Sequence, residues 1–214
     1  RLRITADTDD LTGLPNRRHI LLVAAERFKE ARNRGEGFGV LALDVDHFKP
    51  VNDVHGHSAG DQLLIQISNL LTQISREADW LVRWGGEEFL IVSRFSHRND
   101  AQQMAERIRR TVANHAFTLA DGEILSKTCS IGYACYPFIT DQPDALSWEQ
   151  VIDTADLALY AAKKSGRNRC VGLTATATTP SKQLYRHISQ DLKGMIDRGE
   201  IGVAGDNTDN LVWD

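Results

Sequence analysis

The sequence predicts a fold that mixes α-helices with a β-sheet, of the α+β or mixed α/β class. Several segments repeat apolar residues at helical spacing. Two short segments rich in aromatic and β-branched residues flank a pair of glycines, which is the pattern of an antiparallel β-hairpin. The chain has 214 residues, of which 42% are hydrophobic, and this is enough for one domain with its own core.

The first half of the chain predicts helix and strand in alternation. In order, we expect a helix after Asn16 that ends at Gly35, a buried strand over residues 38–46, a helix over residues 63–74, and hairpin strands over residues 80–84 and 89–95. The two hairpin strands join through Gly85 and Gly86, because glycine accepts the positive φ of a tight turn.

The second half predicts a helix over residues 101–114, a strand over residues 127–136, and a helix over residues 148–164 that ends at Ser165 and Gly166. The chain after Gly172 stands apart, because it begins polar and rich in threonine. Apolar residues then recur at every fourth position, at Leu184, Ile188, Leu192 and Ile196. This spacing predicts an amphipathic helix, either packed on the domain's own surface or docked on a partner or second subunit.

Composition excludes some function classes. With 25 basic and 29 acidic residues the net charge is -4, so no global basic field predicts binding to a nucleic acid polymer or an anionic membrane. No apolar run is long enough to cross a bilayer, and three cysteines, an odd number, favour a reduced, cytoplasmic setting for the domain. The start at Arg1 without methionine predicts a piece of a longer protein, and the sequence leaves open whether that parent is membrane-anchored.

Acidic residues gather at the predicted hairpin turn and at the end of the strand before it. The stretch RWGGEEF places Glu87 beside the two glycines, which alone is typical of a solvated turn. Asp44 and Asp46 lie two residues apart at the end of the predicted strand and share a face. Asp44 and Glu87 together would supply two carboxylates from neighbouring strand ends, an arrangement that holds Mg²⁺ against substrate phosphates.

The segment between these motifs, DHFKPVNDVHGHSAGDQLL, carries side chains that can read a base. Asn52 and Asp61 can each recognise a base that bears an amide. The carboxylate of Asp61 can accept hydrogen bonds from the N1–H and amino group of guanine, a pattern that adenine lacks.

Six stretches of the chain resemble, in order, the signatures of GGDEF-domain diguanylate cyclases. They are DLTGLPNRR, DVDHFKPVND, GHSAGDQLL, RWGGEEF, TCSIGYA and ADLALYAAKKSGRNR. The resemblance covers about residues 9–172, which leaves residues 1–8 as the end of a linker from an upstream module and residues 173–214 as a C-terminal extension. Glu87 stands where the family's name has Asp, and it keeps a carboxylate at that position.

The resemblance implies a central, mixed and largely antiparallel β-sheet surrounded by helices, similar to the palm-like core of nucleotide cyclases and polymerases. It also implies that two GTP-loaded subunits face each other. Each ribose 3′-hydroxyl then attacks the other substrate's α-phosphate, pyrophosphate leaves, and cyclic di-GMP results. The implied partners are therefore GTP, cyclic di-GMP, a second copy of the domain, and an upstream sensory or dimerising domain that controls the encounter.

The resemblance also assigns roles to individual residues. Asp44 and Glu87 match catalytic metal ligands, with the Val45 carbonyl as a backbone donor, for two Mg²⁺ ions that Mn²⁺ is able to replace. Glu87 is either a proton acceptor or a metal anchor, and the two roles stay open. Asn52 and Asp61 match the guanine contacts.

The remaining matched residues surround the phosphates. Phe48 and Lys49 lie in a loop expected to wrap the phosphates through backbone N–H groups. Lys163 and Arg167, expected one helical turn apart on one face, match the cations that grip the triphosphate. Gly85 and Gly86 are expected to keep the turn clear of the nucleotide.

Upstream of the turn, the stretch READ from Arg76 to Asp79 matches the RxxD inhibitory site of many family members, where bound product restrains turnover. Arg107 is expected to contribute a second arginine to that site. Without the resemblance, Arg76 reads as a helix-terminal arginine paired with a nearby carboxylate.

Two rival functions remain at this level. A catalytically silent GGDEF domain would act as a receptor for GTP or cyclic di-GMP, but such relatives usually lose the acidic turn or the metal aspartate. A generic Mg²⁺-dependent nucleotidyl transferase or purine cyclase would share the paired carboxylates without needing both the guanine-reading pair and the RxxD stretch. Comparing ATP with GTP as substrate separates this second rival from a diguanylate cyclase.

Overall fold

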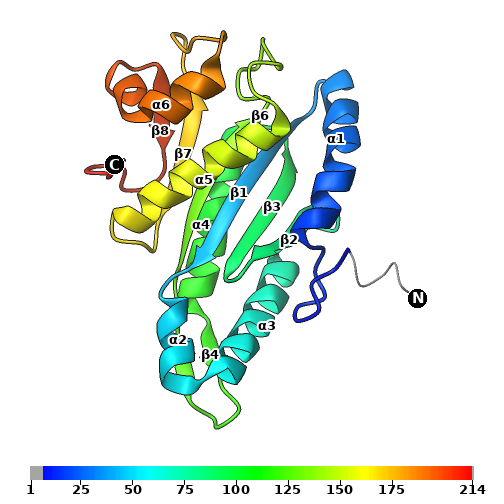
Figure 1. Cartoon of the computed structure of the whole chain (residues 1–214), viewed down its shortest axis with the longest axis vertical. Helices are drawn as coiled ribbons and strands as arrows, with labels where there is room; N and C mark the ends of the chain where they lie inside the picture. The colour runs from blue at the N-terminus through cyan, green and yellow to red at the C-terminus, as the bar shows by residue number, and fades with distance from the viewer. Residues whose placement is uncertain (1–6, 214) are drawn as a thin grey trace.

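The computed structural model describes residues 7–213, so residues 1–6 of the expected linker lie outside the described part. A six-stranded sheet forms the centre, with the strand order β2-β3-β1-β6-β7-β8 (Figure 1). All pairs in it are antiparallel except β6 with β7. Its strands are β1 (Gly37–Val45), β2 (Trp80–Gly85), β3 (Glu88–Phe95), β6 (Cys129–Tyr136), β7 (Cys170–Ala175) and β8 (Ile201–Ala204). The α+β class predicted by the sequence patterns is confirmed, and so is the mixed, largely antiparallel sheet that the family resemblance implied.

Helices cover both faces of this sheet, and a small second sheet pairs β4 (Ala116–Thr118) with β5 (Ile124–Ser126). The helices are α1 (Arg17–Asn33), α2 (Phe48–His55), α3 (His57–Ile74), α4 (Asn99–Asn114), α5 (Trp148–Lys164) and α6 (Leu184–Asp197). One hydrophobic cluster joins one sheet face to α1, α5 and α6, and a second cluster joins the other face to α2, α3 and α4. Because both faces are covered, β6 is buried over its whole length.

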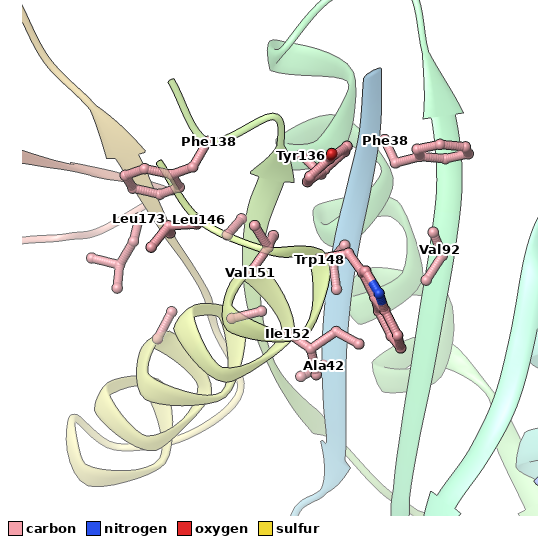
Figure 2. Packing of buried hydrophobic residues seen from close by; sticks show 14 of the residues in the cluster. Phe38, Ala42, Val92, Tyr136, Phe138, Leu146, Trp148, Val151, Ile152 and Leu173 are labelled. Atoms are coloured by element: carbon pink, nitrogen blue, oxygen red, sulfur yellow. The ribbon is translucent and has the colours of Figure 1, made fainter. Parts of the chain in front are cut away.

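The first cluster contains a layer of aromatic rings near one end of the sheet. The ring of Phe28 on α1 stacks on Trp148 of α5 with centroids 5.5 Å apart, and it meets Tyr136 of β6 edge-on at 5.0 Å. Figure 2 shows three aromatic residues of this cluster, which are Phe38 of β1, Tyr136 of β6 and Trp148 at the start of α5. Burying such rings contributes about 2 kcal/mol each, so this layer fixes α1 and the start of α5 on the sheet.

The predicted helices and strands are confirmed, with differences of one or two residues at most of their ends. The exception is α3, which begins at His57, six residues before the predicted start at position 63. The helix over residues 148–164 has the predicted bounds, because Ser147 caps it and forms a capping box with Gln150. The expected loop after β1 is wrong, since it forms α2 with Pro50 in the first turn, where proline is tolerated. The short strands β4, β5, β7 and β8 were not predicted.

The C-terminal extension adds a strand to the sheet. β8 pairs with β7, and α6 packs through the buried side chains of Leu184 and Ile188, as expected for a helix on the domain's own surface. The helix is interrupted at Asp191, where φ is -150° and ψ is 44°. The every-fourth-residue stripe therefore breaks after Ile188, and Met195 becomes the buried residue of the second half.

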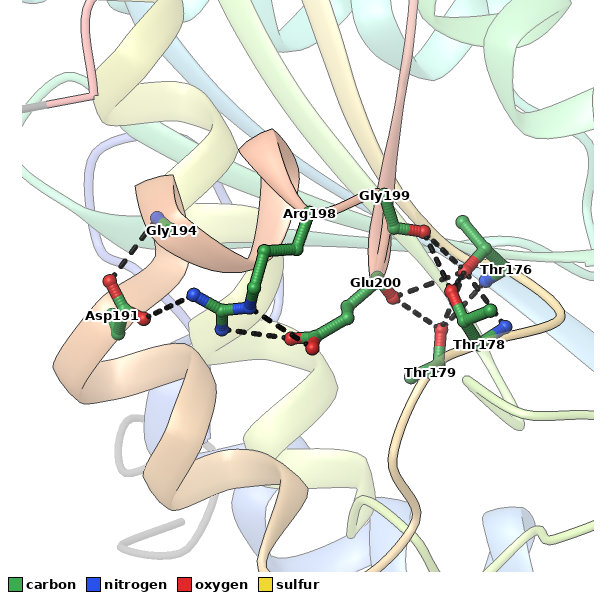
Figure 3. A network of polar contacts seen from close by, with 8 residues as sticks. All are labelled: Thr176, Thr178, Thr179, Asp191, Gly194, Arg198, Gly199 and Glu200. Carbon is green, nitrogen blue, oxygen red and sulfur yellow. Dashed lines mark hydrogen bonds and ion pairs between the residues drawn. The ribbon is translucent and has the colours of Figure 1, made fainter.

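Polar contacts connect the threonine-rich stretch to the residues before β8 (Figure 3). The hydroxyl of Thr176 donates to the carbonyl of Gly199 at 2.8 Å, and the hydroxyl of Thr179 donates to that of Glu200 at 2.5 Å. Arg198 lies between the carboxylates of Asp191 and Glu200, at 3.0 and 2.9 Å. The stretch is therefore a structural connection between two strands.

None of the helices formed by the described residues has both the length and the apolar content needed to span a membrane. Cys129, Cys135 and Cys170 are free and buried.

Candidate functional site

The candidate site lies where β1 ends. Asp44 pairs in register with Glu88 of β3 on one side and with Ser130 of β6 on the other. The backbone N–H of Val45 donates to the carbonyl of Glu87 at 3.2 Å. The structure therefore brings Asp44, Val45 and Glu87 together, because the β1–β3 register places the hairpin turn directly beside the end of β1.

Negative charge at this site is incompletely balanced. Asp44 is only 4% exposed, and it accepts a hydrogen bond from the ammonium group of Lys163 at 2.9 Å. Burial raises the pKa of Asp44, Lys163 lowers it in part, and the neighbouring charge of Glu87 raises it further. Burial, then the charge of Asp44, likewise raises the pKa of Glu88. A divalent cation would relieve this crowding of carboxylates.

The donor set suits a magnesium ion better than a metal bound by protein side chains alone. Among residues 7–213, no three His, Cys, Asp or Glu side chains converge closely enough to hold a metal ion. Mg²⁺ is usually bound by one or two carboxylates while water and substrate phosphates fill its other positions. Asp44 and Glu87, with the backbone at Val45, fit this pattern.

The two predicted guanine contacts lie at the corner between α2 and α3. Gly56, with φ of 85° and ψ of 164°, ends the first helix and begins the second, so the chain turns sharply there. The side chain of Asn52 lies against Gly60, where a Cβ atom would be 1.9 Å from Asn52 Oδ1. Asn52 is half-buried and Asp61 is exposed, so both are placed beside an open surface at the start of α3.

Phe48 and Lys49 were expected in a loop, and that expectation is wrong. Both lie in the first turn of α2, after His47 in the left-handed conformation (φ 53°). The side chain of Phe48 is buried in the second hydrophobic cluster, and the ammonium of Lys49 pairs with Asp53 at 2.8 Å on the surface. The backbone N–H groups of a first helical turn have no partner within the helix, so an anion can still be bound there.

Lys163 and Arg167 do not lie one helical turn apart on one face, as was expected. Lys163 is in the last turn of α5, but the helix ends at Lys164 and Arg167 lies in the loop beyond it with φ of 62°. The backbone N–H of Arg167 donates to the carbonyl of Ala162 at 3.0 Å, which turns the chain back over the helix end. The glycine at position 166, with φ of 108°, makes this turn possible.

Arg83, which the sequence reasoning missed, holds the acidic turn in place. One guanidinium nitrogen of Arg83 donates to the carbonyl of Gly86, and another lies 3.3 Å from the carboxylate of Asp9. Asp9 also accepts from the backbone and hydroxyl of Thr12, so the stretch before α1 is fixed to the hairpin. Gly86 has φ of 37°, and no atom lies within 4 Å of a Cβ placed there, so the turn is open on that side.

Asp46 has a different role from Asp44 although the two share a motif. Its carboxylate accepts from the hydroxyls of Thr128 and Ser130, each at 2.7 Å, and from the backbone N–H of Asn168 at 3.0 Å. Asp46 is 2% exposed, and these three donors satisfy it. It is therefore a structural residue that ties β6 and the loop after α5 to the end of β1, which the sequence alone did not reveal.

The residues of the expected inhibitory site lie at the other end of β2. Arg76 and Arg107 line one pocket of about 160 Å³, together with Phe95 and Asp100. The carboxylate of Asp79 accepts from the backbone N–H of Arg76 at 2.8 Å and from the hydroxyl of Ser93. Asp79 thus accepts a hydrogen bond from the backbone of Arg76, and Arg76 is an exposed residue.

Comparison with protein families matches residues 6–169 to the model described as "Diguanylate cyclase, GGDEF domain". This match covers more than half of the chain. The chain belongs to the GGDEF family. The resemblance identified from the six sequence stretches is thereby confirmed.

Named relatives of this GGDEF domain include cyclases and regulators. Diguanylate cyclase DosC of Escherichia coli K12 is 38% identical over 161 residues, which are 75% of this chain and 34% of DosC. Response regulator PleD of Caulobacter vibrioides is 40% identical over 171 residues, which are 79% of this chain and 37% of PleD. The chain thus spans about a third of the length of these curated relatives.

Solved structures similar to this GGDEF domain share its architecture. The coiled coil and GGDEF domain of DgcB from Caulobacter crescentus, in complex with c-di-GMP, superposes with a TM-score of 0.72 at 30% identity, covering 80% of this chain and 87% of that one. Diguanylate cyclase SiaD from Pseudomonas aeruginosa, in complex with its activator SiaC, gives a TM-score of 0.71 at 37% identity, covering 80% and 63%. The similarity in fold therefore extends over most of the GGDEF domain.

Proposed function

We propose that this GGDEF domain is a diguanylate cyclase that converts two GTP molecules into cyclic di-GMP and two pyrophosphates. The observation that supports this most strongly is the crowded pair of carboxylates, Asp44 and Glu87, beside the ammonium of Lys163 in a chain of this family. Each ribose 3′-hydroxyl attacks the α-phosphate of the other GTP. Two phosphodiester bonds form, and the two bonds to pyrophosphate break.

The activity is proposed to depend on two Mg²⁺ ions per site, with Mn²⁺ able to substitute, held by Asp44, Glu87 and the Val45 carbonyl. When bound, these ions neutralise triphosphate charge and lower the pKa of the attacking hydroxyl. Lys163 already contributes positive charge beside Asp44, so it can contact the phosphates that approach the ions.

The remaining site residues orient the substrate. Asn52 and Asp61 would hold the guanine at the corner of α2 and α3, where the side chain of Asn52 is packed against the helix. The first turn of α2, with Phe48 and Lys49, and the loop that carries Arg167 would bind the phosphates from two sides. Positioning of this kind, together with electrostatic stabilisation of the transferring group, accounts for most of the catalysis of phosphoryl transfer.

Catalysis is proposed to require two copies of the domain. One copy offers one set of guanine-reading residues and one pair of carboxylates, whereas the product joins two guanosine units. Two loaded domains must therefore face each other, and an upstream sensory or dimerising module would raise their effective concentration. The similar structure of DgcB contains a coiled coil as well as a GGDEF domain.

Product inhibition is proposed to act at Arg76, Asp79 and Arg107. The support is that Arg76 and Arg107 are exposed residues that line one pocket, so both can contact phosphates or guanine edges. Titration with cyclic di-GMP should lower the initial rate of the wild-type chain. We expect Arg76→Ala to raise the inhibition constant by at least about tenfold, and an unchanged constant would contradict this site.

The alternative is a catalytically silent domain that acts as a receptor for GTP or cyclic di-GMP. The presence of Asp44, Glu87, Asn52, Asp61 and Lys163 favours the enzyme, because catalytically silent relatives usually lose the acidic turn or the metal aspartate. A generic purine cyclase is a weaker alternative. Equal use of ATP and GTP would support that alternative and contradict the proposed guanine contacts.

The deciding experiment is incubation of the purified chain with GTP and Mg²⁺, with nucleotides resolved by chromatography. Glu87→Gln keeps the size of the side chain and removes its charge, so we expect about 100- to 1000-fold less cyclic di-GMP. If the wild-type chain yields no product, fusion to a dimerising coiled coil supplies the second active half. Continued absence of product from the forced dimer, after bound nucleotide is stripped, would favour the receptor.

A further inference from the structure

The loop between α5 and β7, residues 165–169, has an uncommon backbone conformation. Arg167 and Asn168 are consecutive residues other than glycine with positive φ, of 62° and 46°. Side chains rarely adopt this left-handed region, and asparagine does so more readily than most. Two such residues in succession persist only where the surroundings hold them, which is common at functional sites.

Asn168 makes two contacts that hold this conformation. Its backbone N–H donates to Asp46 Oδ2 at 3.0 Å, and its side-chain Oδ1 accepts from Arg109 Nη1 at 2.7 Å. Arg109 is itself fixed, because it donates twice to the carboxylate of Glu106, at 2.9 and 2.6 Å. The side chains of Arg109 and Glu106 are only 19% and 15% exposed, so the partner of Asn168 is rigid.

The two contacts come from different layers of the molecule. Asp46 follows β1 directly, next to the Asp44–Val45 pair, whereas Arg109 projects from α4. That helix covers the sheet face opposite to α5, the helix from which the loop emerges. Asn168 therefore fixes the loop to the end of the sheet and to the far helix layer at once.

We propose that Asn168 is a positioning residue whose side-chain contact with Arg109 holds the α5–β7 loop so that Arg167 faces the triphosphate of the substrate. This inference rests on the proposed function, because it assigns the nucleotide triphosphate as the group that Arg167 grips. It predicts an effect on triphosphate binding that is separate from base binding. Asn52 and Asp61, the proposed base contacts, lie on other elements, α2 and α3.

The most direct test of this role is the variant Asn168→Gly in the 214-residue chain. Glycine keeps the backbone N–H that donates to Asp46 and accepts positive φ without steric strain, so the variant removes the contact with Arg109 and also increases the backbone freedom of the loop. Arg109→Ala removes the same contact from the other side. Arg110→Ala is the matched control, since Arg110 is the next residue on α4 and also binds Glu106, but its contacts do not include Asn168.

The probe is 3′-deoxy-GTP with Mg²⁺, because it carries the triphosphate but lacks the hydroxyl that reacts. GMP is the comparison ligand, because it keeps the base, the ribose and the α-phosphate but lacks the β- and γ-phosphates. For Asn168→Gly we expect about tenfold weaker binding of 3′-deoxy-GTP, GMP affinity within about twofold of wild type, and a melting temperature lowered by no more than a few degrees. The KM for GTP should rise more than kcat falls. Arg109→Ala should show the same selective loss, and Arg110→Ala should bind both nucleotides as the wild type does.

Two outcomes for Asn168→Gly would overturn the inference. One is wild-type affinity for 3′-deoxy-GTP, and the other is an equal loss of affinity for 3′-deoxy-GTP and GMP, which would indicate general loosening of the domain. If Arg109→Ala lowers the melting temperature, its weaker binding could come from general destabilisation. In that case the result for Asn168→Gly alone decides whether the inference holds. Failure of the wild-type chain to bind 3′-deoxy-GTP would instead overturn the proposed function, so the two failures are distinguishable.

Discussion

Carboxylates in two regions of this molecule have pKa values that are shifted in opposite directions. At the end of β1, burial raises the pKa of Asp44, which is 4% exposed, and the same cause raises the pKa of the half-buried Glu88. On α4, hydrogen bonds from Arg109 and then Arg110 lower the pKa of Glu106 to about 2. Burial alone therefore does not decide the direction of the pKa shift. The number of positively charged side chains that contact the carboxylate decides it.

The difference separates a site built for a ligand from a site built for stability. Asp44 has one lysine, Lys163, which must balance several carboxylates, whereas Glu106 is bound by two arginines. An under-neutralised cluster costs folding free energy and is retained where a bound cation or substrate completes it. A carboxylate such as Glu106, whose charge is already balanced by arginines, has no need of a ligand, and its role is to stabilise the fold.

Asp44→Asn should have the largest effect and should affect activity alone. The amide is a poor ligand for a hard cation, so cyclic di-GMP formation should fall by about 100- to 1000-fold. The melting temperature should stay the same or rise, because the variant removes a buried charge that its neighbours do not fully balance. The measurements are initial rates with GTP and Mg²⁺ and thermal unfolding of the same preparations. A clear loss of stability would show that Asp44 is as structural as Glu106.

Glu106→Gln should have the opposite profile. The amide can accept from one arginine, but its NH₂ group faces guanidinium donors, so at least one charge-assisted hydrogen bond is lost. We expect a loss of about 2 kcal/mol in the free energy of unfolding, measured by urea denaturation near pH 7. Stability equal to that of the wild type would mean that the two arginines do not depend on Glu106, and the contrast between the two regions would fail.

The pH dependence of stability should separate the two groups by sign. Glu106 binds fewer protons in the folded state, so its contribution is present above pH 4.5 and is lost as the pH falls toward about 2. Asp44 binds more protons in the folded state, so its contribution falls as the pH rises from 3.8 through its raised pKa. The measurement is urea denaturation from pH 3 to 7 in the presence of EDTA. Below pH 4.5, the midpoint for Glu106→Gln should rise less steeply with pH than the wild-type midpoint. The midpoint for Asp44→Asn should fall less than the wild-type midpoint as the pH rises.

The sequence predicted the carboxylates at the end of β1, but it did not predict the structural contacts that hold the surrounding residues in place. Asp44 and Glu87 could be paired because strand periodicity and the hairpin turn place both at one sheet end. The structural role of Asp46 depends on donors from residues 128, 130 and 168, which are distant in sequence, so no local pattern predicts it. Arg167 was placed on a helix because Lys163 and Arg167 have helical spacing, but the helix ends at Lys164.

The fold was predictable to a similar degree. Long periodic segments such as α5 were located correctly, because an amphipathic face and a capping box are local signals. The short strands β7 and β8 were missed, since they are set by pairing with distant partners and only four to six residues long. The helix α2 was taken as a loop because its eight residues include proline and its apolar pattern is short.

Arg110→Ala should have the smallest effect, and it tests how the site around Glu106 is built. Arg109 and Arg110 both bind Glu106 at 2.6 to 2.7 Å, but the side chain of Arg110 is 64% exposed and that of Arg109 only 19%. Water and salt screen an exposed pair, so the loss in unfolding free energy should not exceed about 0.5 kcal/mol. A loss as large as that of Glu106→Gln would mean that the exposed arginine is the essential partner. The rigidity of Arg109, on which the proposed positioning of Asn168 depends, would then need Arg110 as well.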